Sequence, residues 1–292
     1  MICVYLLGME RQSKWQRVWE ETGQLDLFAS RGSRPEIIPF QSMLIWNICR
    51  PAKERAASQL DWLKRQNASV IVLTETAQNE GCELLQRGLT ESGYRVVASL
   101  PEGREYGTII ASKCGGEPSE FADNLPYLPY RAASMSLEVE PLEIIGVYIP
   151  SRSGTHSLNS DITDDKIDRK RDFLSSFLET LALDNTTPRI ICGDFNVVPR
   201  NHLPTQPLFQ DWEYGFLESL EKMGYVDAFL LHDPERQDHS WFGHDGNKQR
   251  LDYCFIPKSL ASRMADASFD HIPRQIKLSD HSVLKVIFNE LI

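Results

Sequence analysis

Arg189-Ile190-Ile191-Cys192-Gly193-Asp194-Phe195-Asn196 is a short apolar run that ends abruptly in polar residues. The pattern predicts a buried strand that delivers its last side chains to the edge of a sheet. Because side chains two apart on a strand share a face, Asp194 and Asn196 are expected to point into one site while Phe195 points away. A carboxylate beside an amide suits proton transfer and the binding of an oxyanion. Gly-Asp followed by Asn is equally typical of a turn, and the rest of the chain must decide.

Polar residues also end other apolar runs of the chain. The runs at 43–46 and 69–74 end in Asn47 and Glu75, for example. One polar residue at a strand end is routine, whereas a series of them is hard to assign to turns alone. The residues in this series are Asn47, Glu75, Tyr148, Asp194, Asn196, Asp252, Asp280 and His281.

Predicted strands outnumber predicted helices, and short turns join many of them. This balance favours a mixed sheet, or two packed sheets, over a doubly wound parallel sheet. At 292 residues the chain is long enough for one large α/β domain or two smaller ones. Besides the run at 189–196, the expected strands are 43–46, 69–74, 94–98, 107–112, 132–139, 143–149, 250–256 and 283–288, and the expected helices are 51–67, 79–92, 164–183 and 211–223.

The net charge of −10 gives the chain no global attraction to nucleic acid. A phosphate-binding surface would therefore be a local basic patch on an acidic body. The basic residues of 166–171 are expected to form a solvated helix face, with contacts to DNA phosphates as the alternative. The six cysteines show neither disulfide nor zinc spacing. No apolar stretch reaches membrane-spanning length, and the expectation is a soluble protein of the cytoplasm.

Residues 1–41 differ in pattern from the rest and are expected to form an extension that precedes a domain at 42–292. Within the extension, an apolar segment at 24–28 lies between glycine-rich or polar flanks. Such a segment either docks on its own domain or binds a partner.

Six strand-end motifs stand in the order found in the endonuclease/exonuclease/phosphatase superfamily, which the chain resembles over about 42–290. Within it, the chain is most similar to the exonuclease III type of apurinic/apyrimidinic (AP) endonuclease, with further local support from 224–229 and from Ser240-Trp241-Phe242. The resemblance implies a four-layer α/β/β/α sandwich of two packed mixed sheets flanked by helices. The six motifs are Leu44–Asn47, Val72–Glu75, Val147–Pro150, Gly193–Asn196, Arg250–Tyr253 and Ser279–His281.

The resemblance also implies a role for each strand-end residue in metal-dependent phosphodiester hydrolysis. Glu75 and Asp280, helped by Asn47, would hold Mg²⁺, or Mn²⁺ in its place, since both ions prefer hard oxygen ligands. Asp194 would orient or deprotonate the attacking water. The groups that would contact the phosphate are Asn47, Tyr148, Asn196 and His281, with Asp252 fixing the His281 ring.

Further substrate contacts are implied for Arg152, Arg250 and Trp241. Alternatives remain for several of these residues: a core aromatic role for Tyr148 and Trp241, and for Asp252 a role only as the ion-pair partner of Arg250. Two positions depart from the family pattern. Cys49 stands where many relatives have a carboxylate or amide, and Ser151 replaces an asparagine that contacts the substrate. Both changes affect substrate choice more than hydrolysis.

The segment at 24–28 resembles the motif by which bacterial replication and repair proteins bind the β sliding clamp. The alternative is one helical turn that packs on the domain through Leu25 and Phe28. The residues implied in clamp binding are Gln24, Leu25, Asp26, Leu27 and Phe28.

The predicted function is Mg²⁺-dependent hydrolysis of a DNA phosphodiester by a repair-type AP endonuclease or 3′ exonuclease. One alternative is a superfamily phosphodiesterase or phosphatase that acts on RNA, nucleotides or another phosphoester. A second is a non-catalytic DNA-repair adaptor bound to the clamp.

Overall fold

The computed structural model describes residues 36–101, 103–152, 164–205, 209–243 and 246–290. The predicted clamp-binding residues 24–28 lie outside the described residues, as does all but the end of the predicted extension. Among the described helices, none has the length and apolarity needed to cross a membrane.

Two six-stranded mixed sheets form the centre of the domain. The first has the order β13-β14-β1-β2-β4-β3, in which β1 and β2 are parallel and the other neighbours antiparallel. Its strands are β1 (Ser42–Asn47), β2 (Val70–Thr76), β3 (Arg95–Ala98), β4 (Gly107–Ser112), β13 (Met264–Asp270) and β14 (Val283–Phe288).

The second sheet has the order β5-β6-β7-β8-β12-β9, and only β7 and β8 among its paired neighbours in the described chain are parallel. Its strands are β5 (Glu117–Pro118), β6 (Ala132–Ser136), β7 (Glu143–Tyr148), β8 (Arg189–Asp194), β9 (Tyr225–Asp227) and β12 (Asp252–Pro257). The decisive run of the sequence is therefore a central strand of this sheet, as predicted.

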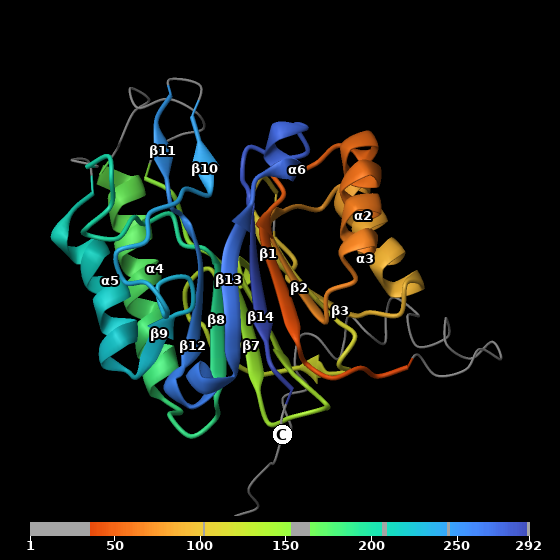
Figure 1. Cartoon of the computed structure of the whole chain (residues 1–292). Helices are drawn as coiled ribbons and strands as arrows, with labels where there is room; N and C mark the ends of the chain where they lie inside the picture. The colour runs from red at the N-terminus through yellow and green to blue at the C-terminus, as the bar shows by residue number, and fades with distance from the viewer. Residues whose placement is uncertain (1–35, 102, 153–163, 206–208, 244–245, 291–292) are drawn as a thin grey trace, which may run out of the picture. The chain divides into compact units, whose positions relative to one another are not determined.

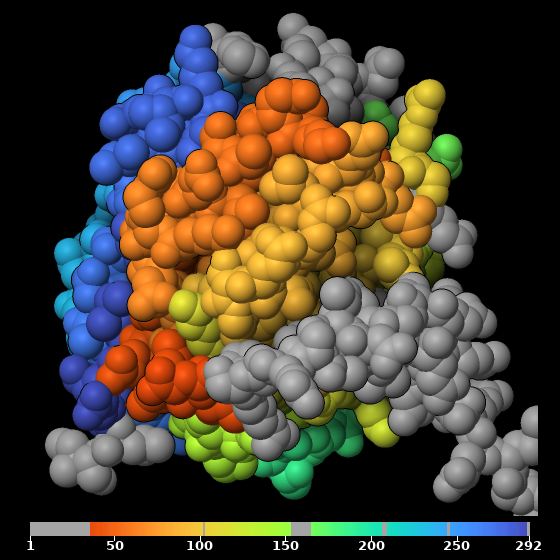
Figure 2. Space-filling view, turned by 90° about the vertical axis from the view of Figure 1, so that its right-hand side faces the viewer, coloured from red at the N-terminus to blue at the C-terminus, as the bar shows by residue number. Residues whose placement is uncertain are grey.

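Helices cover the outer face of each sheet, which gives four layers (Figure 1). Helices α2 (Lys53–Gln66) and α3 (Glu80–Glu91) lie over the first sheet and form the face seen in Figure 2. Helices α4 (Asp164–Ala182) and α5 (Asp211–Lys222) lie over the second. The predicted α/β/β/α sandwich is confirmed. The shorter elements are η2 (Pro129–Arg131), η3 (Lys258–Arg263), α6 (Ile272–Gln275) and the hairpin of β10 (Trp241–Phe242) and β11 (Lys248–Gln249).

Burial on both faces explains why the central strands are apolar over most of their length. On β1, Met43 and Ile45 belong to the core between the two sheets, whereas Leu44 and Trp46 belong to the core under α2 and α3. Both faces of the strand are buried, so no polar side chain fits before its end. Cys192 on β8 is fully buried in the core between the sheets, as expected of a small apolar residue.

Strand direction brings the polar ends together. Strands β1 and β2 are parallel, as are β7 and β8, and β12 and β14 run antiparallel to their neighbours. The register places Asp194 opposite both Tyr148 on β7 and Asp252 on β12. Residues that end β1, β2, β7 and β8 therefore meet residues that begin β12 or precede β14.

The sequence analysis missed β13, an edge strand that pairs with β14. Its sequence Met-Ala-Asp-Ala-Ser-Phe-Asp is partly solvent-exposed and carries polar residues at alternate positions from Asp266. An edge strand needs less apolar sequence than a central one, so its hydrophobic signal is weak. The predicted strand at 132–139 is also shorter than expected, ending at Ser136.

Gly193 allows β8 to approach β7 closely just before Asp194. Its φ of 138° lies in the region that favours glycine, and an added Cβ would collide with the carbonyl oxygen of Val147. We predict that Gly193→Ala lowers the free energy of unfolding by about 2–5 kcal/mol through strain and overpacking. Chemical denaturation measures this loss.

Gly215 supplies the matched control, since it lies on α5 and a Cβ there meets nothing within 4 Å. Gly215→Ala should leave stability unchanged or raise it by up to about 1 kcal/mol. A Gly193→Ala protein as stable as the wild type would contradict the close-approach argument.

Candidate active site

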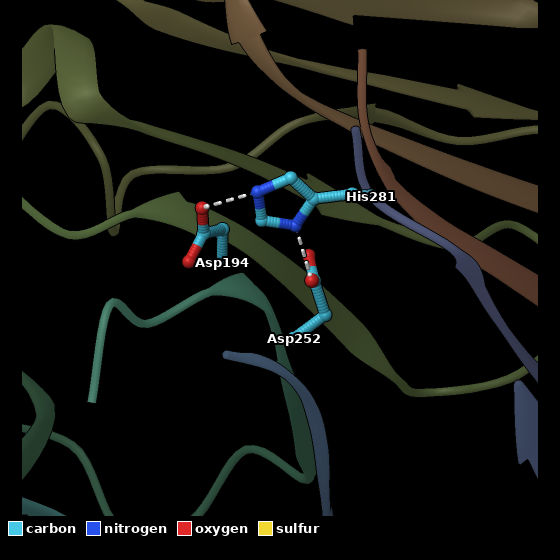
Figure 3. Close-up of side chains that lie close together, drawn as sticks. All are labelled: Asp194, Asp252 and His281. Atoms are coloured by element: carbon cyan, nitrogen blue, oxygen red, sulfur yellow. Dashed lines mark hydrogen bonds and ion pairs between the residues drawn. The ribbon is translucent and has the colours of Figure 1, made fainter. Parts of the chain in front are cut away.

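Three buried side chains form the centre of the candidate site. The His281 ring lies between the carboxylates of Asp194 and Asp252 (Figure 3). Its Nδ1 lies 2.7 Å from Asp252 Oδ2, and its Nε2 lies 3.9 Å from Asp194 Oδ2. Each of the three residues is at most 4% exposed. The bond between Asp252 and His281 implied by the family resemblance is present.

The charges of these three groups alter one another's pKa values. Burial alone would lower the pKa of His281, but the charge and hydrogen bond of Asp252, with the charge of Asp194, outweigh it and raise the pKa. Burial and the charge of Asp252 raise the pKa of Asp194, despite the opposing effect of His281. A buried imidazolium beside a carboxylate of increased basicity is an acid–base arrangement.

Asn47 holds the Asp194 carboxylate from the other sheet. Its Nδ2 donates to Asp194 Oδ2 at 2.8 Å, and its Oδ1 accepts the backbone N–H of Cys49 at 2.9 Å. The amide is fully buried, and both of its ends are engaged within the protein. In this structure Asn47 orients Asp194, whereas the sequence analysis expected it at a metal or phosphate.

Asn196 reaches the site by a turn and not by strand alternation. β8 ends at Asp194, and Asn196 has a φ of 51°. Its N–H donates to Asp194 Oδ1 at 2.9 Å, and its Nδ2 donates to the Ile149 carbonyl oxygen at 2.9 Å. Asn196 therefore lies in a turn beside Asp194, and the prediction that strand alternation places it there was wrong.

A buried ion cluster supports this turn. Lys170 Nζ donates to the Asn196 carbonyl oxygen and to Glu213 Oε1, both at 2.6 Å. Arg152 pairs with the other Glu213 oxygen at 3.1 Å. Lys170 is 1% exposed, so the expectation of a solvated basic face over 166–171 was wrong at this position. Sequence periodicity identified neither Lys170 nor Glu213, because their burial depends on packing between α4 and α5.

Glu75 enters the site through an irregularity in β2. The register of β2 against β4 shifts between Thr74 and Thr76, and Glu75 between them has a φ of 52°. Tyr148 donates its hydroxyl hydrogen to Glu75 Oε1 at 2.7 Å. Burial, with the charges of Glu75 and Asp194, raises the pKa of Tyr148 well above its ordinary value, so Tyr148 acts as a donor.

Trp241 contacts the predicted metal ligand Asp280. Its Nε1 donates to Asp280 Oδ2 at 3.0 Å, and the ring is half-buried. Cys49 lies near the same carboxylate, and burial with the charges of Asp280 and Glu75 raises the pKa of its thiol to about 12. The thiol is therefore protonated at neutral pH and is a poor ligand for a hard cation.

Two predicted substrate contacts are engaged inside the protein. Arg250 is 3% exposed and pairs with Asp227 at 2.6 Å. It supports neither Asp252 nor an open surface, which corrects the expected pairing. Arg152 is 7% exposed and is held against Glu213, so the predicted direct contact of Arg152 with the substrate is not what this structure shows.

Two serines that the sequence analysis did not single out hold the site backbone. The Ser279 hydroxyl donates to the Asn47 carbonyl oxygen at 2.6 Å and accepts the His281 N–H at 3.2 Å. The Ser240 hydroxyl accepts the N–H groups of Leu251 and Asp252 at 2.9 and 3.1 Å. Both serines belong to the sequence motifs on which the family resemblance is based, and those motifs could have identified them.

The donor chemistry fits a divalent cation. Glu75 and Asp280 offer the hard oxygens that Mg²⁺ prefers. The ligand atoms of Asp194, Asp252 and His281 lie within 4.8 Å of one another, and Asp252 Oδ1 is buried without a hydrogen-bond partner in the described residues. An unsatisfied buried carboxylate oxygen in such a cluster indicates a place for a cation or a proton donor.

The fold and this arrangement define a class of phosphoester hydrolase. The model of the Endonuclease/Exonuclease/phosphatase family matches residues 44–281, and the chain belongs to this family. An exodeoxyribonuclease of Bacillus subtilis (strain 168) is 27% identical over 266 residues, which cover 85% of this chain and 99% of that protein.

Solved structures show the same fold. An AP endonuclease from Archaeoglobus fulgidus superposes with a TM-score of 0.71 at 22% identity, covering 85% of this chain and 99% of that one. A variant of the 3′ phosphatase NExo from Neisseria, bound to a product DNA hairpin, superposes with a TM-score of 0.70 at 18% identity. The match covers 86% of this chain and 100% of that one. The 3′-5′ exonuclease NExo from Neisseria meningitidis superposes with a TM-score of 0.70 at 19% identity, and the match covers 85% of this chain and 100% of that one.

We predict that Asp252→Asn lowers the pKa of His281 relative to the wild type. Removal of the Asp252 charge takes away the main influence that raises the pKa, while burial, which lowers it, remains. NMR titration of the His281 ring protons in the metal-free protein measures the change. Asp266→Asn, on edge strand β13, is the control and should leave the His281 titration unchanged. An unaltered titration in Asp252→Asn would contradict the electrostatic account.

Proposed function

We propose that the protein is a Mg²⁺-dependent phosphodiester hydrolase that acts on DNA, either an AP endonuclease or a 3′ exonuclease of the cytoplasm. The observation that carries the proposal is the buried group of Asp194, Asp252 and His281 at the common end of the two sheets. The family match and the names of the similar proteins, which include an exodeoxyribonuclease and an AP endonuclease, support DNA as the substrate.

Asp194 is the proposed base for the attacking water. Hydrogen bonds from Asn47 Nδ2 and the Asn196 N–H fix its two oxygens, so the carboxylate cannot rotate. Its raised pKa makes it a better proton acceptor than an exposed aspartate. A water placed against this carboxylate can lose its proton as it attacks phosphorus.

His281 is the proposed donor to a phosphate oxygen. The Asp252 carboxylate accepts from Nδ1 at 2.7 Å, which orients the ring and directs Nε2–H towards Asp194 and the space beside it. The second N–H of the Asn196 amide is a further donor for charge that develops on the phosphate. These groups are fixed by the fold before substrate arrives.

Glu75 and Asp280 would hold the cation. Tyr148 fixes one oxygen of Glu75, and Trp241 fixes one oxygen of Asp280, which limits the orientations of both carboxylates. Mg²⁺ bound there would neutralise charge on the phosphate, and Mn²⁺ has similar preferences.

We predict that Asp194→Asn slows hydrolysis by about 10²- to 10⁴-fold, because the amide cannot accept the proton of the water. Single-turnover cleavage of a labelled abasic duplex in Mg²⁺ measures the rate. Asp211→Asn, which changes an exposed aspartate on α5, is the charge-matched control and should retain the wild-type rate. Wild-type activity in Asp194→Asn would contradict the assignment of the base.

A panel of substrates separates the substrate classes. Abasic duplex, undamaged duplex with a recessed 3′ end, duplex with a 3′ phosphate, RNA and inositol phosphates are compared with Mg²⁺, Mn²⁺ and EDTA. Preference for RNA or inositol phosphates would refute DNA as the substrate. No hydrolysis of any member, together with no binding of Mg²⁺ that depends on Glu75, would favour a non-catalytic adaptor.

We further propose that residues 24–28 bind a bacterial β sliding clamp. The family match begins at residue 44, so this segment precedes the matched hydrolase region. Burial of Leu25, Leu27 and Phe28 would contribute about 1.5–3 kcal/mol each. After the cost of ordering the segment, binding of roughly micromolar strength remains.

We predict that the double variant Leu27→Ala, Phe28→Ala abolishes retention of the full-length protein on immobilised clamp, because most of the buried apolar area is lost. Leu6→Ala, Leu7→Ala removes equally apolar side chains from the same extension and is the control. Surface plasmon resonance measures both. Unchanged binding of the first variant, or equal loss in the control, would show that 24–28 is not the contact.

A further inference from the structure

Three arginines from separate elements converge on residues 104–106. Arg131 Nη2 and Arg169 Nη2 donate to the same oxygen, Oε2, of Glu105, at 2.6 and 2.7 Å. Arg50 Nη2 donates to the carbonyl oxygens of Arg104 and Glu105, at 2.7 and 3.3 Å. Arg131 belongs to η2, Arg169 to α4, and Arg50 to the loop after β1. This group of arginines and Glu105 is called the Glu105 cluster below.

The Glu105 cluster borders the candidate active site. The Arg131 guanidinium lies 4.9 Å from the ring centroid of Tyr148, whose hydroxyl donates to Glu75. The ring of Tyr106 packs edge-on against Tyr148 with centroids 5.4 Å apart. The side chain of Tyr148 therefore contacts both Arg131 of the cluster and the predicted metal ligand Glu75.

Positive charge exceeds negative charge in this cluster. Two guanidinium groups share the Glu105 carboxylate, and a third, that of Arg50, bonds backbone carbonyl oxygens of the same segment. The Nε atoms of all three arginines are buried without hydrogen-bond partners among the described residues. The cluster is also reachable from solvent, since the side chains of Glu105 and Arg169 are 27% and 32% exposed. On a protein with a net charge of −10, it is a local basic patch of the kind that binding to DNA requires.

We propose that Glu105 is an internal counterion that occupies the place of a DNA backbone phosphate, and that substrate phosphate displaces its carboxylate from Arg169 and Arg131. The inference rests on the proposed function, because it takes DNA as the substrate. A guanidinium bonds a phosphate with the same geometry as a carboxylate. The displacement exchanges one anion for another, so in the wild type competition from the Glu105 carboxylate reduces, without abolishing, what the phosphate gains from these arginines.

Removal of the carboxylate releases both arginines for the phosphate. Glu105→Gln keeps the size of the side chain and should tighten DNA binding by about 3- to 10-fold. The plot of log Kd against log salt should steepen by up to about 0.9, the contribution of one additional neutralised phosphate. Arg169→Gln should weaken binding and flatten the same plot, and it should cancel most of the gain when combined with Glu105→Gln.

Fluorescence anisotropy of a labelled abasic duplex, measured across a salt series, tests the inference. Each change is made in the full-length Asp194→Asn protein, so that the DNA remains intact during the measurement. Glu117→Gln is the matched control, because Glu117 also pairs with an arginine, Arg95, and its loss changes net charge equally. The control should alter Kd by less than about 2-fold.

Equal or weaker binding by a folded Glu105→Gln protein would overturn the inference, as would the same tightening in Glu117→Gln. If Glu105→Gln lowers the thermal midpoint so far that the protein cannot be assayed, the salt slope of Arg169→Gln decides whether the inference holds. A Glu105–Arg169 pair with a purely structural role predicts that this slope equals that of the wild type. If the wild type cuts the duplex but the Glu105→Gln protein binds it no more tightly than the wild type does, this inference is refuted and the proposed function is not. Duplex that the wild type neither binds nor cuts refutes the proposed function and the inference with it.

Discussion

A buried hydrogen bond from Asn47 Nδ2 to Asp194 Oδ2 joins the two sheets at the end where the polar residues gather. Asp194 is 1% exposed, and a buried carboxylate without partners would cost several kcal/mol. Its hydrogen-bond donors are Asn47 on the opposite sheet and the N–H of Asn196 in the turn, and His281 lies 3.9 Å away as an ion-pair partner. The packing of the two sheets and the orientation of the proposed base therefore depend on the same contact, and neither can shift without the other.

The sequence predicted the strands and the residues at their ends because both faces of the central strands are buried. Runs such as 190–193 carry no polar side chain until the sheet ends, so the position of Asp194 follows from local pattern. That Asp252 and His281 would meet it was implied by the order of the motifs and the family they resemble. Local periodicity alone contains no information about which strands pair.

The predictions made from the sequence were wrong where the conformation of a residue, or its partner, depends on distant parts of the chain. Glu75 has a φ of 52°, which no local pattern around it indicated, whereas the φ of 51° at Asn196 fits the turn that the sequence left open as an alternative to a strand. Arg250 was expected to contact the substrate or to support Asp252, two residues away, but its partner is Asp227 across 23 positions. Lys170 is buried among solvated neighbours because Glu213 on α5 lies opposite it. The choice of partner for a buried charge is a property of tertiary packing.

The groups proposed for hydrolysis and those proposed for substrate contact lie in different parts of this fold. The proposed hydrolytic groups lie at strand ends, where sheet hydrogen bonds fix the backbone, whereas Glu105 and Tyr106 lie on a connecting loop. At physiological salt, charges act over about 8 Å, so local arginines attract DNA only near contact, while the net charge of −10 opposes approach. A nuclease of this charge gains little from electrostatic steering. Tethering through residues 24–28 would raise its local concentration on DNA without altering the loop contacts that choose the substrate.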